Sequence, residues 1–282
     1  MTAPASQTVF RSESVKIGWF RASPSHPRFR DSGPPGDHLF VFPRAGVWIE
    51  HEGRRPFVAD PNVVTFYNPS QQYFRSPVSR RGDHSDWFAL RLEILEAQFA
   101  AFGLPVDANG EAIYPFLSGP GDPATYLEQR RLVRRLRDGR VADPLEVEER
   151  VLDLGARVVA SAARSLEVRV RKAPSARHRQ LVEAARELLA ARFRERLTID
   201  AIACELAASP FHLSRVFRRL TGLTLHQYRM RLRLSNGLVD LTERPLTDLA
   251  LDLGFSSHSH FTVAFRRLYG ATPRAVRELL SA

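Results

Sequence analysis

Residues 208–221 read ASPFHLSRVFRRLT, and residues 254–269 read GFSSHSHFTVAFRRLY. Each stretch contains a serine, a histidine and an aromatic residue ahead of the tetrapeptide Phe-Arg-Arg-Leu, which begins at Phe217 in the first copy and at Phe265 in the second. The flanking residues also align, with one residue added after Ser256. A repeated pattern of this length indicates that one structural unit has been duplicated.

Each copy has the pattern of a helix-turn-helix, over about 199–220 and 247–269. A small residue, Ala203 or Ala250, stands in the first helix where the second helix has to cross it. A serine before the second helix is expected to cap it. The expected caps are Ser209, followed by Pro210, and Ser256 or Ser257, followed by His258.

The turn inside each unit favours a residue with positive φ. Gly254 meets this requirement easily in the second unit, because glycine has no Cβ. Ala207 occupies the matching position in the first unit, where we expect the same backbone conformation at a higher conformational cost.

The outer face of each second helix is predicted to read bases in the major groove. Arg215 can make a paired hydrogen bond to guanine, worth about 1–3 kcal/mol of discrimination. For His212 and His260, packing or capping is the alternative to base reading. The predicted base-reading residues are Phe211, His212, Ser214 and Arg215 in the first copy and His258, Ser259 and Thr262 in the second.

Further arginines are predicted to bind phosphates, adding affinity without sequence information. These are Arg218, Arg219, Arg266, Arg267 and Arg229. A long helix within residues 223–244 is expected to separate the two reading helices by about one DNA turn, roughly 34 Å. We expect Arg229, Arg231 and Arg233 to form a cationic stripe along it.

The charge is divided unevenly along the chain. Residues 1–170 hold 22 Lys+Arg and 21 Asp+Glu, a net +1, whereas residues 171–282 hold 19 and 10, a net +9. A basic domain beside a neutral one favours a polyanionic partner for the basic part, with a solvated basic surface as the alternative.

The first hundred residues predict short strands. Seven segments rich in β-branched and aromatic residues are separated by Gly, Pro, Asn and Asp, which favours an antiparallel barrel or sandwich. The segments are 15–20, 38–42, 47–51, 55–58, 62–68, 71–78 and 86–93.

The periodicity becomes helical from about residue 123. Two helices are expected, over 123–139 and 143–166, and they either cover the barrel or pair with another subunit. Residues 165–180, which are basic and contain Pro174, are interpreted as a linker.

Residues 181–280 resemble the DNA-binding domain of the AraC/XylS family of bacterial transcription regulators. The most specific part is the stretch PLTDLALDLGFSSHSHFTVAFRRLYGATPRAVREL. The family pattern implies seven helices, with two helix-turn-helix units joined by a connecting helix. Val263 departs from the pattern, because a polar or basic residue often reads DNA there, and this suggests weaker base readout by the second copy.

The strand rhythm and the resemblance together predict an α+β fold. An N-terminal cupin-like antiparallel β-barrel with flanking helices would precede a C-terminal all-α domain with two helix-turn-helix motifs. We place a sensor or dimerisation barrel at 1–120, a helical dimerisation or linker region at 121–172, and the DNA-binding domain at 173–282.

The alternative function is a cupin-type enzyme or metal-binding barrel fused to a DNA-binding module. Its candidate metal ligands are His38, His51, His84 and Asp86, but the N-terminal half contains no His-x-His pair of the kind found in a metal-binding cupin, and the sequence contains no G-x-S-x-G nucleophile motif. We therefore predict no metal, no cofactor and no catalytic residue.

An effector pocket would need an apolar interior with a few polar groups. Candidates for its lining, with barrel core or rim as the alternative, are Trp48, Phe66, Tyr73, Trp87, Arg44 and Arg75. Cys204, the one cysteine, is expected to be a buried core thiol and fits a reducing cytoplasm. We see no secretory signal and no membrane span.

The sequence thus predicts a cytoplasmic, sequence-specific transcription regulator, an activator by the commoner outcome in the family. Its expected partners are double-stranded promoter DNA, RNA polymerase, a small-molecule effector and a second copy of the chain. Each subunit would read two successive major-groove segments.

Overall fold

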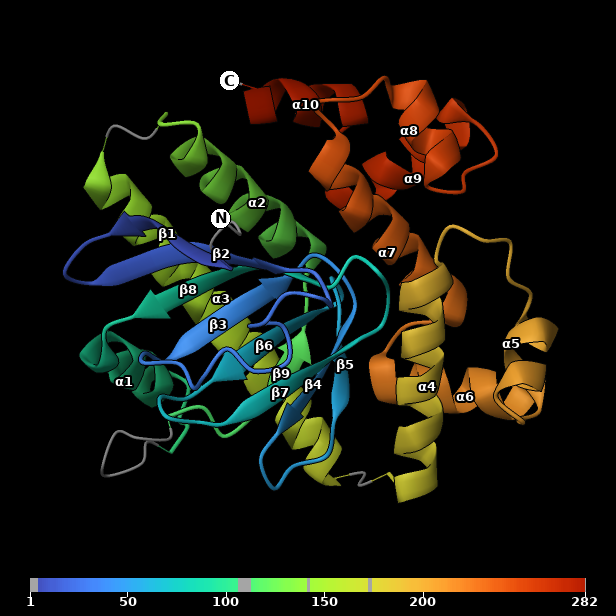
Figure 1. Cartoon of the computed structure of the whole chain (residues 1–282), viewed down its shortest axis with the longest axis horizontal. Coiled ribbons are helices and arrows are strands. Elements are labelled where there is room, and N and C mark those ends of the chain that lie inside the picture. The colour runs from blue at the N-terminus through green and yellow to red at the C-terminus, as the bar shows by residue number, and fades with distance from the viewer. Residues whose placement is uncertain (1–4, 106–112, 141–142, 172–173, 282) are drawn as a thin grey trace. The chain divides into compact units, whose positions relative to one another are not determined.

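The computed structural model describes residues 5–105, 113–140, 143–171 and 174–281 (Figure 1). The chain divides into two compact units, Met1–Arg171 and Lys172–Ala282. The boundary predicted between residues 172 and 173 lies outside the described residues.

Unit 1 contains two antiparallel sheets. The larger sheet has the strand order β1-β2-β8-β3-β6-β9, and the smaller has the order β5-β4-β7. The strands are β1 (Ser6–Arg11), β2 (Val15–Ala22), β3 (Leu39–Pro43), β4 (Val47–His51), β5 (Phe57–Ala59), β6 (Val63–Tyr67), β7 (Tyr73–Pro77), β8 (Asp83–Leu90) and β9 (Ser118–Pro120).

All seven predicted strands are present, but the closed barrel is not confirmed. No described strand of the larger sheet pairs with a strand of the smaller one, so the ladder has open edges at β1, β9, β5 and β7. The sequence pattern did not reveal β1, β9 or the helix α1 (Leu92–Ala101).

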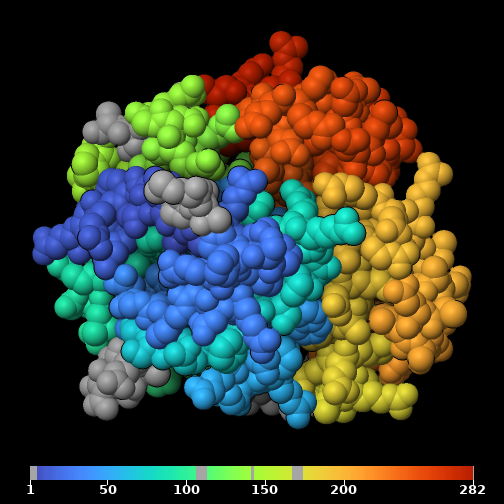
Figure 2. Space-filling model, viewed as in Figure 1, coloured from blue at the N-terminus to red at the C-terminus, as the bar shows by residue number. Residues whose placement is uncertain are grey.

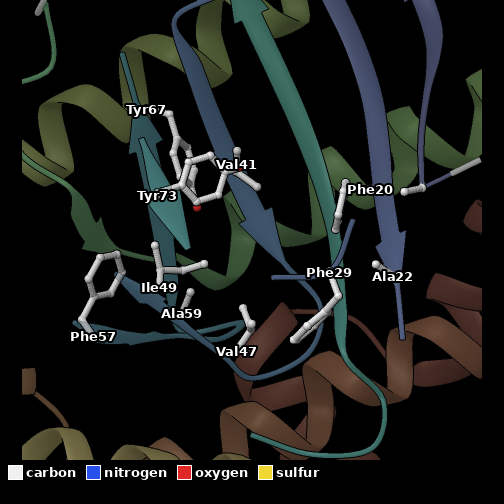
Figure 3. Packing of buried hydrophobic residues seen from close by; sticks show 11 residues of the cluster. Phe20, Ala22, Phe29, Val41, Val47, Ile49, Phe57, Ala59, Tyr67 and Tyr73 are labelled. Atoms are coloured by element: carbon white, nitrogen blue, oxygen red, sulfur yellow. The ribbon is translucent and has the colours of Figure 1, made fainter. Parts of the chain in front are cut away.

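The two sheets pack face to face around a cluster of buried apolar side chains (Figure 3). Phe20, Val41 and Tyr67 come from the larger sheet, and Ile49 and Tyr73 come from the smaller one. Alternation along each strand sends these residues to one face. The cluster therefore holds the two sheets together as a sandwich.

Helices cover the other face of the larger sheet. Phe40 and Phe88 stack there with ring centroids 5.2 Å apart. Gly119 of β9 lies so close to α3 (Pro144–Arg171) that an added Cβ would meet the Cβ of Ala162 at 2.7 Å. Of the two alternatives for the predicted helices, α2 (Pro123–Arg137) and α3, packing on the sheet is the one observed within the chain.

Within the described residues of unit 2, the regular secondary structure is helical, with turns and short loops between the helices. They are α4 (Ala176–Arg192), α5 (Ile199–Glu205), α6 (Pro210–Thr221), α7 (Leu225–Asp240), α8 (Leu246–Asp252), α9 (His258–Tyr269) and α10 (Pro273–Ser281). None of the helices in the described part of the chain is long and apolar enough to cross a membrane.

Three local expectations were wrong. The segment interpreted as a linker is mostly helical, because α3 continues to Arg171 and α4 begins at Ala176; residues 172 and 173 are not described. Cys204 is exposed, because the core side of the short helix α5 is taken by Ile202 and Ala203. Arg233 is buried and belongs to no outer stripe.

Candidate nucleic-acid interface

Two helix-turn-helix units are formed by α5 with α6 and by α8 with α9. Their turns have the predicted left-handed backbone, with φ of 48° at Ala207 and 84° at Gly254. Ser209 caps α6 by accepting a hydrogen bond from the amide of His212, with Pro210 as the next residue. Ser257, one of the two serines considered, caps α9 in the same way.

The inward faces of α6 and α9 anchor both helices in the core of unit 2. Leu213, Val216 and Phe217 are buried on α6, and Phe261 and Phe265 are buried on α9. The spacing of three and four residues leaves the opposite face of each helix directed outward. Figure 2 shows the side chains of α5 and α6 at the surface of unit 2.

The outward face of α6 presents an aromatic ring and a guanidinium side by side. Phe211 is 77% exposed, and the guanidinium carbon of Arg215 lies 6.0 Å from the centre of its ring. Ser214 is half-buried. His212 is also half-buried, and its ring lies 5.3 Å from the ring of His178 on α4.

The outward face of α9 is less polar. His258 and Ser259 are exposed at its first turn, and Val263 is 68% exposed. The hydroxyl oxygen of Thr262 is enclosed and has no hydrogen-bond partner. His260 packs its ring 5.3 Å from the ring of Phe255, which is the packing alternative considered for this residue.

Four of the five predicted phosphate ligands are available for an external anion. Arg218, Arg219, Arg266 and Arg267 are exposed, and none pairs with a carboxylate in the described part of the chain. Other arginines of unit 2 are neutralised, such as Arg192 by Glu195 and Glu205 and Arg244 by Asp252. Both α6 and α9 therefore present arginines whose charge no described carboxylate neutralises.

Arg229, the fifth predicted ligand, has a partner inside unit 2. Its Nη1 donates to the carbonyl oxygen of Leu197 at 3.0 Å. Partial burial lowers the pKa of its guanidinium. These contacts join α7 to the segment that leads into α5.

Arg233, also on α7, links three segments of unit 2. Its Nε donates to the carbonyl of Phe193 at 2.6 Å and its Nη2 donates to that of Glu195 at 2.9 Å, both at the end of α4. Its Nη1 donates to Gly254 in the second turn. The sequence pattern did not predict this role. A signal was present, because the apolar residues Leu232 and Leu234 on either side of Arg233 indicate that this part of the helix is buried.

Unit 1 contains a cavity of about 220 Å³. Of the six candidate lining residues, Tyr73, Arg75 and Trp87 line it, together with other residues that include Phe20 and Asp83. Phe66 instead packs under the helices against Tyr114 and Phe116, Arg44 pairs with Asp86, and Trp48 does not line this cavity.

The charge of Arg75 is compensated inside the cavity wall. Its Nε pairs with Asp83 at 2.7 Å. Its Nη2 donates to the Tyr73 hydroxyl at 2.6 Å, and its Nη1 donates to Ser32 Oγ at 3.0 Å and to the Phe29 carbonyl at 3.3 Å. The hydrogen bonds of Arg75 therefore connect the loop at residues 29–32 to β7.

The four candidate metal ligands do not come together. His51 is enclosed by Phe57, Tyr67 and Tyr73, His84 accepts a hydrogen bond from Arg21, and Asp86 pairs with Arg44 and Arg130. Within the described residues, no three His, Cys, Asp or Glu side chains are grouped so as to hold a metal ion.

Comparison with known proteins places the repeated region among transcription regulators. A family model described as a helix-turn-helix domain matches residues 202–279. The regulatory protein SoxS of Salmonella typhimurium is 36% identical over 105 residues, which cover 36% of this chain and 98% of SoxS. The HTH-type transcriptional activator RhaS of Escherichia coli O157:H7 is 36% identical over 88 residues, 30% of this chain and 32% of RhaS.

A solved structure is similar over the same region. It is a transcriptional regulator of Chromobacterium violaceum described by its AraC-type DNA-binding domain, 29% identical, with 38% of this chain and 97% of that chain covered and a TM-score of 0.35. The named relatives are regulators and not enzymes. The duplicated motif, the match to nearly the whole of SoxS and the unpaired cations on both second helices lead to one conclusion: the chain belongs to the AraC/XylS family of DNA-binding transcription regulators.

Proposed function

We propose that this regulator binds double-stranded promoter DNA by inserting α6 and α9 into two successive major-groove segments. The observation that carries the proposal is the pairing, on one outward face of α6, of the exposed Phe211 with Arg215, beside arginines that no described carboxylate neutralises. An aromatic ring suits a thymine methyl, and a guanidinium suits the O6 and N7 of guanine.

The two reading helices would contribute unequally. On α9 the exposed positions are His258, Ser259 and Val263, and the enclosed hydroxyl of Thr262 would reach a base only after its side chain rotates. We therefore assign most of the sequence discrimination to α6, with His212 and Ser214 as secondary contacts. The proposed phosphate ligands are Arg218, Arg219, Arg266 and Arg267. Arg229 would bind a phosphate only with the N–H groups that its hydrogen bond to the carbonyl oxygen of Leu197 does not use.

Unit 1 is proposed to be a cupin-like sandwich that responds to a small molecule and pairs two copies of the chain. The cavity lined by Tyr73, Arg75 and Trp87 supports an effector site, because it joins aromatic surface to a few polar groups. The helical region at 121–172 is the proposed dimerisation element. A dimer acting in the cytoplasm would span two promoter sites and activate transcription through RNA polymerase.

The proposal is tested by using the protein to select duplexes from a random-sequence pool. The selected duplexes are then footprinted with the bound protein. We expect two protected blocks per subunit, with centres about 10 base pairs apart, on one face of the DNA. Recovery of unrelated sequences with uniform affinity would contradict it.

A further inference from the structure

A histidine outside both helix-turn-helix units lies against the first reading helix. His178 is in the first turn of α4, and its backbone amide donates to Ser175 Oγ at 3.2 Å. Helices α4 and α6 pack against each other (Figure 1), and the rings of His178 and His212 are 5.3 Å apart with a tilt of 48°. This first turn of α4 is therefore next to the face of α6 that carries Arg215.

The groups around His178 are basic side chains, three arginines and one histidine. Its charged or titratable neighbours are Arg219, His212 and Arg215 on α6 and Arg177 on α4 itself. The three residues of α6 are spaced three and four apart, so they form one row along the helix. In the described part of the chain, no carboxylate pairs with any of these five residues.

This arrangement suits an external anion. Partial burial, followed by the charges of Arg219 and its neighbours, lowers the pKa of the His178 imidazole. Its Nδ1 is enclosed and has no hydrogen-bond partner, whereas the residue as a whole is partly exposed. In the proposed complex the protonated ring donates to a phosphate through Nε2. A phosphate placed among these side chains offsets the repulsion by the arginines, which together with burial lowers the pKa of the ring.

We propose that His178 and Arg177 form, with Arg219, a third DNA contact beside the groove entered by α6. This contact, called here the phosphate clamp, binds a phosphate when His178 takes up a proton. The inference rests on the proposed DNA binding and adds a residue and a linkage to it. No base is read by this clamp, so it changes affinity on every sequence, and the specificity stays with Arg215.

Proton uptake on binding gives the pH dependence a definite sign. The free protein holds His178 neutral near pH 7, and the bound phosphate raises its pKa. Between the two pKa values the complex holds one more proton than the free protein, so affinity falls as pH rises. Each unit by which phosphate raises the pKa corresponds to about a tenfold change in affinity.

The experiment measures binding of the full-length protein to its selected duplex between pH 6 and pH 8 at several salt concentrations. For the unmodified protein we expect binding about tenfold weaker at pH 8 than at pH 6. We also expect a salt slope that is steeper at pH 6 by about 0.9, the value for one additional phosphate contact.

Three variants make the assignment specific. His178→Gln should lose that part of the pH dependence and show the same salt slope at both pH values. His178→Lys carries a permanent charge, so it should bind at pH 8 as tightly as the unmodified protein does at pH 6. His226→Gln, an exposed histidine of α7, is the matched control and should keep the pH dependence of the unmodified protein.

The inference and the proposed function fail in different ways. If His178→Gln binds the selected site with an unchanged pH profile and salt slopes, the clamp does not exist and the groove-reading proposal stands. The clamp is equally excluded if His178→Lys leaves binding at pH 8 unimproved while far-UV circular dichroism shows a folded protein. If the unmodified protein prefers no sequence at all, the proposed function itself is overturned.

Discussion

Arg233 of α7 donates a hydrogen bond of 2.6 Å to the carbonyl oxygen of Gly254, in the turn of the second helix-turn-helix unit. The same guanidinium binds the carbonyls of Phe193 and Glu195 at the end of α4. One buried side chain therefore joins the connecting helix, the segment that follows α4 and the turn of the second helix-turn-helix unit. We therefore expect the relative placement of α6 and α9 to depend on this link.

Replacing Arg233 should destabilise unit 2 selectively. Arg233→Met leaves several enclosed carbonyls without donors, and we expect a loss of about 2–4 kcal/mol in the free energy of unfolding. Unit 2 contains no tryptophan, since Trp19, Trp48 and Trp87 all lie in unit 1. The urea transition followed by far-UV circular dichroism should therefore shift, and the transition followed by tryptophan fluorescence should not.

The exposed Arg218 provides the matched control for that substitution. Arg218→Met should change stability by less than about 0.5 kcal/mol, as is usual for surface positions. Equal losses for the two variants would show that the carbonyl contacts of Arg233 do not stabilise the unit.

The two turn residues should respond to exchange in opposite directions. Ala207→Gly relieves a left-handed alanine and should stabilise unit 2 by about 0.5–1 kcal/mol. Gly254→Ala should destabilise it by more than this, because an added Cβ would lie 2.2 Å from the carbonyl oxygen of Arg194 as well as adopt an unfavourable φ. The circular dichroism transition in urea measures both, and a stabilising Gly254→Ala would contradict the turn geometry.

Arg215 and Arg219 should separate base reading from phosphate binding. Arg215→Ala should weaken binding to the selected site by roughly 10- to 100-fold, equivalent to about 1–3 kcal/mol, while largely sparing random DNA. Arg219→Ala should weaken binding on all sequences and reduce the salt slope by about one. Fluorescence anisotropy with specific and random duplexes at three salt concentrations distinguishes them; a uniform loss for Arg215→Ala would make it a phosphate contact.

Unit 1 should lose stability in mild acid. His51 is fully buried without hydrogen-bond partners, and burial, with a smaller effect of Arg54, lowers its pKa to about 4. The unfolded chain has a pKa near 6.5, so it binds more protons between about pH 4 and 6.5. Stability then falls as pH falls through this window, with a slope approaching about 1.4 kcal/mol per pH unit for one such histidine.

Substitution of His51 tests this origin. His51→Leu should stabilise unit 1 more at pH 5 than at pH 7, as measured by the tryptophan fluorescence transition in urea. Ile49→Val, in the same buried cluster, is the control and should cost about 0.5–1.5 kcal/mol equally at both pH values. An identical effect of His51→Leu at the two pH values would exclude His51 as the titrating group.

Local patterns were sufficient for most elements of this fold. The seven strands found from residues 15 to 90 are regular runs of β-branched and aromatic residues with turn residues between them, and such signals require no distant contact. The same holds for the cap at Ser209 and for the positive φ at Ala207 and Gly254, which the spacing of the repeat predicts. The strand β1 was missed because its buried face is narrow, and all six of its residues are exposed or half-buried.

The sequence alone determined the duplicated helix-turn-helix, the outward face of its second helices and the family, because each depends on residues that are close together along the chain. Only the tertiary structure decided which charges are free. Arg233 and Arg219 are both arginines within basic helical segments, and the sequence pattern does not distinguish them. In the structure, Arg233 is buried and bonded to carbonyl oxygens, whereas Arg219 is exposed. The same holds for the open sandwich in place of a barrel and for His178 beside His212, because strand closure and side-chain burial depend on partners far away in the chain.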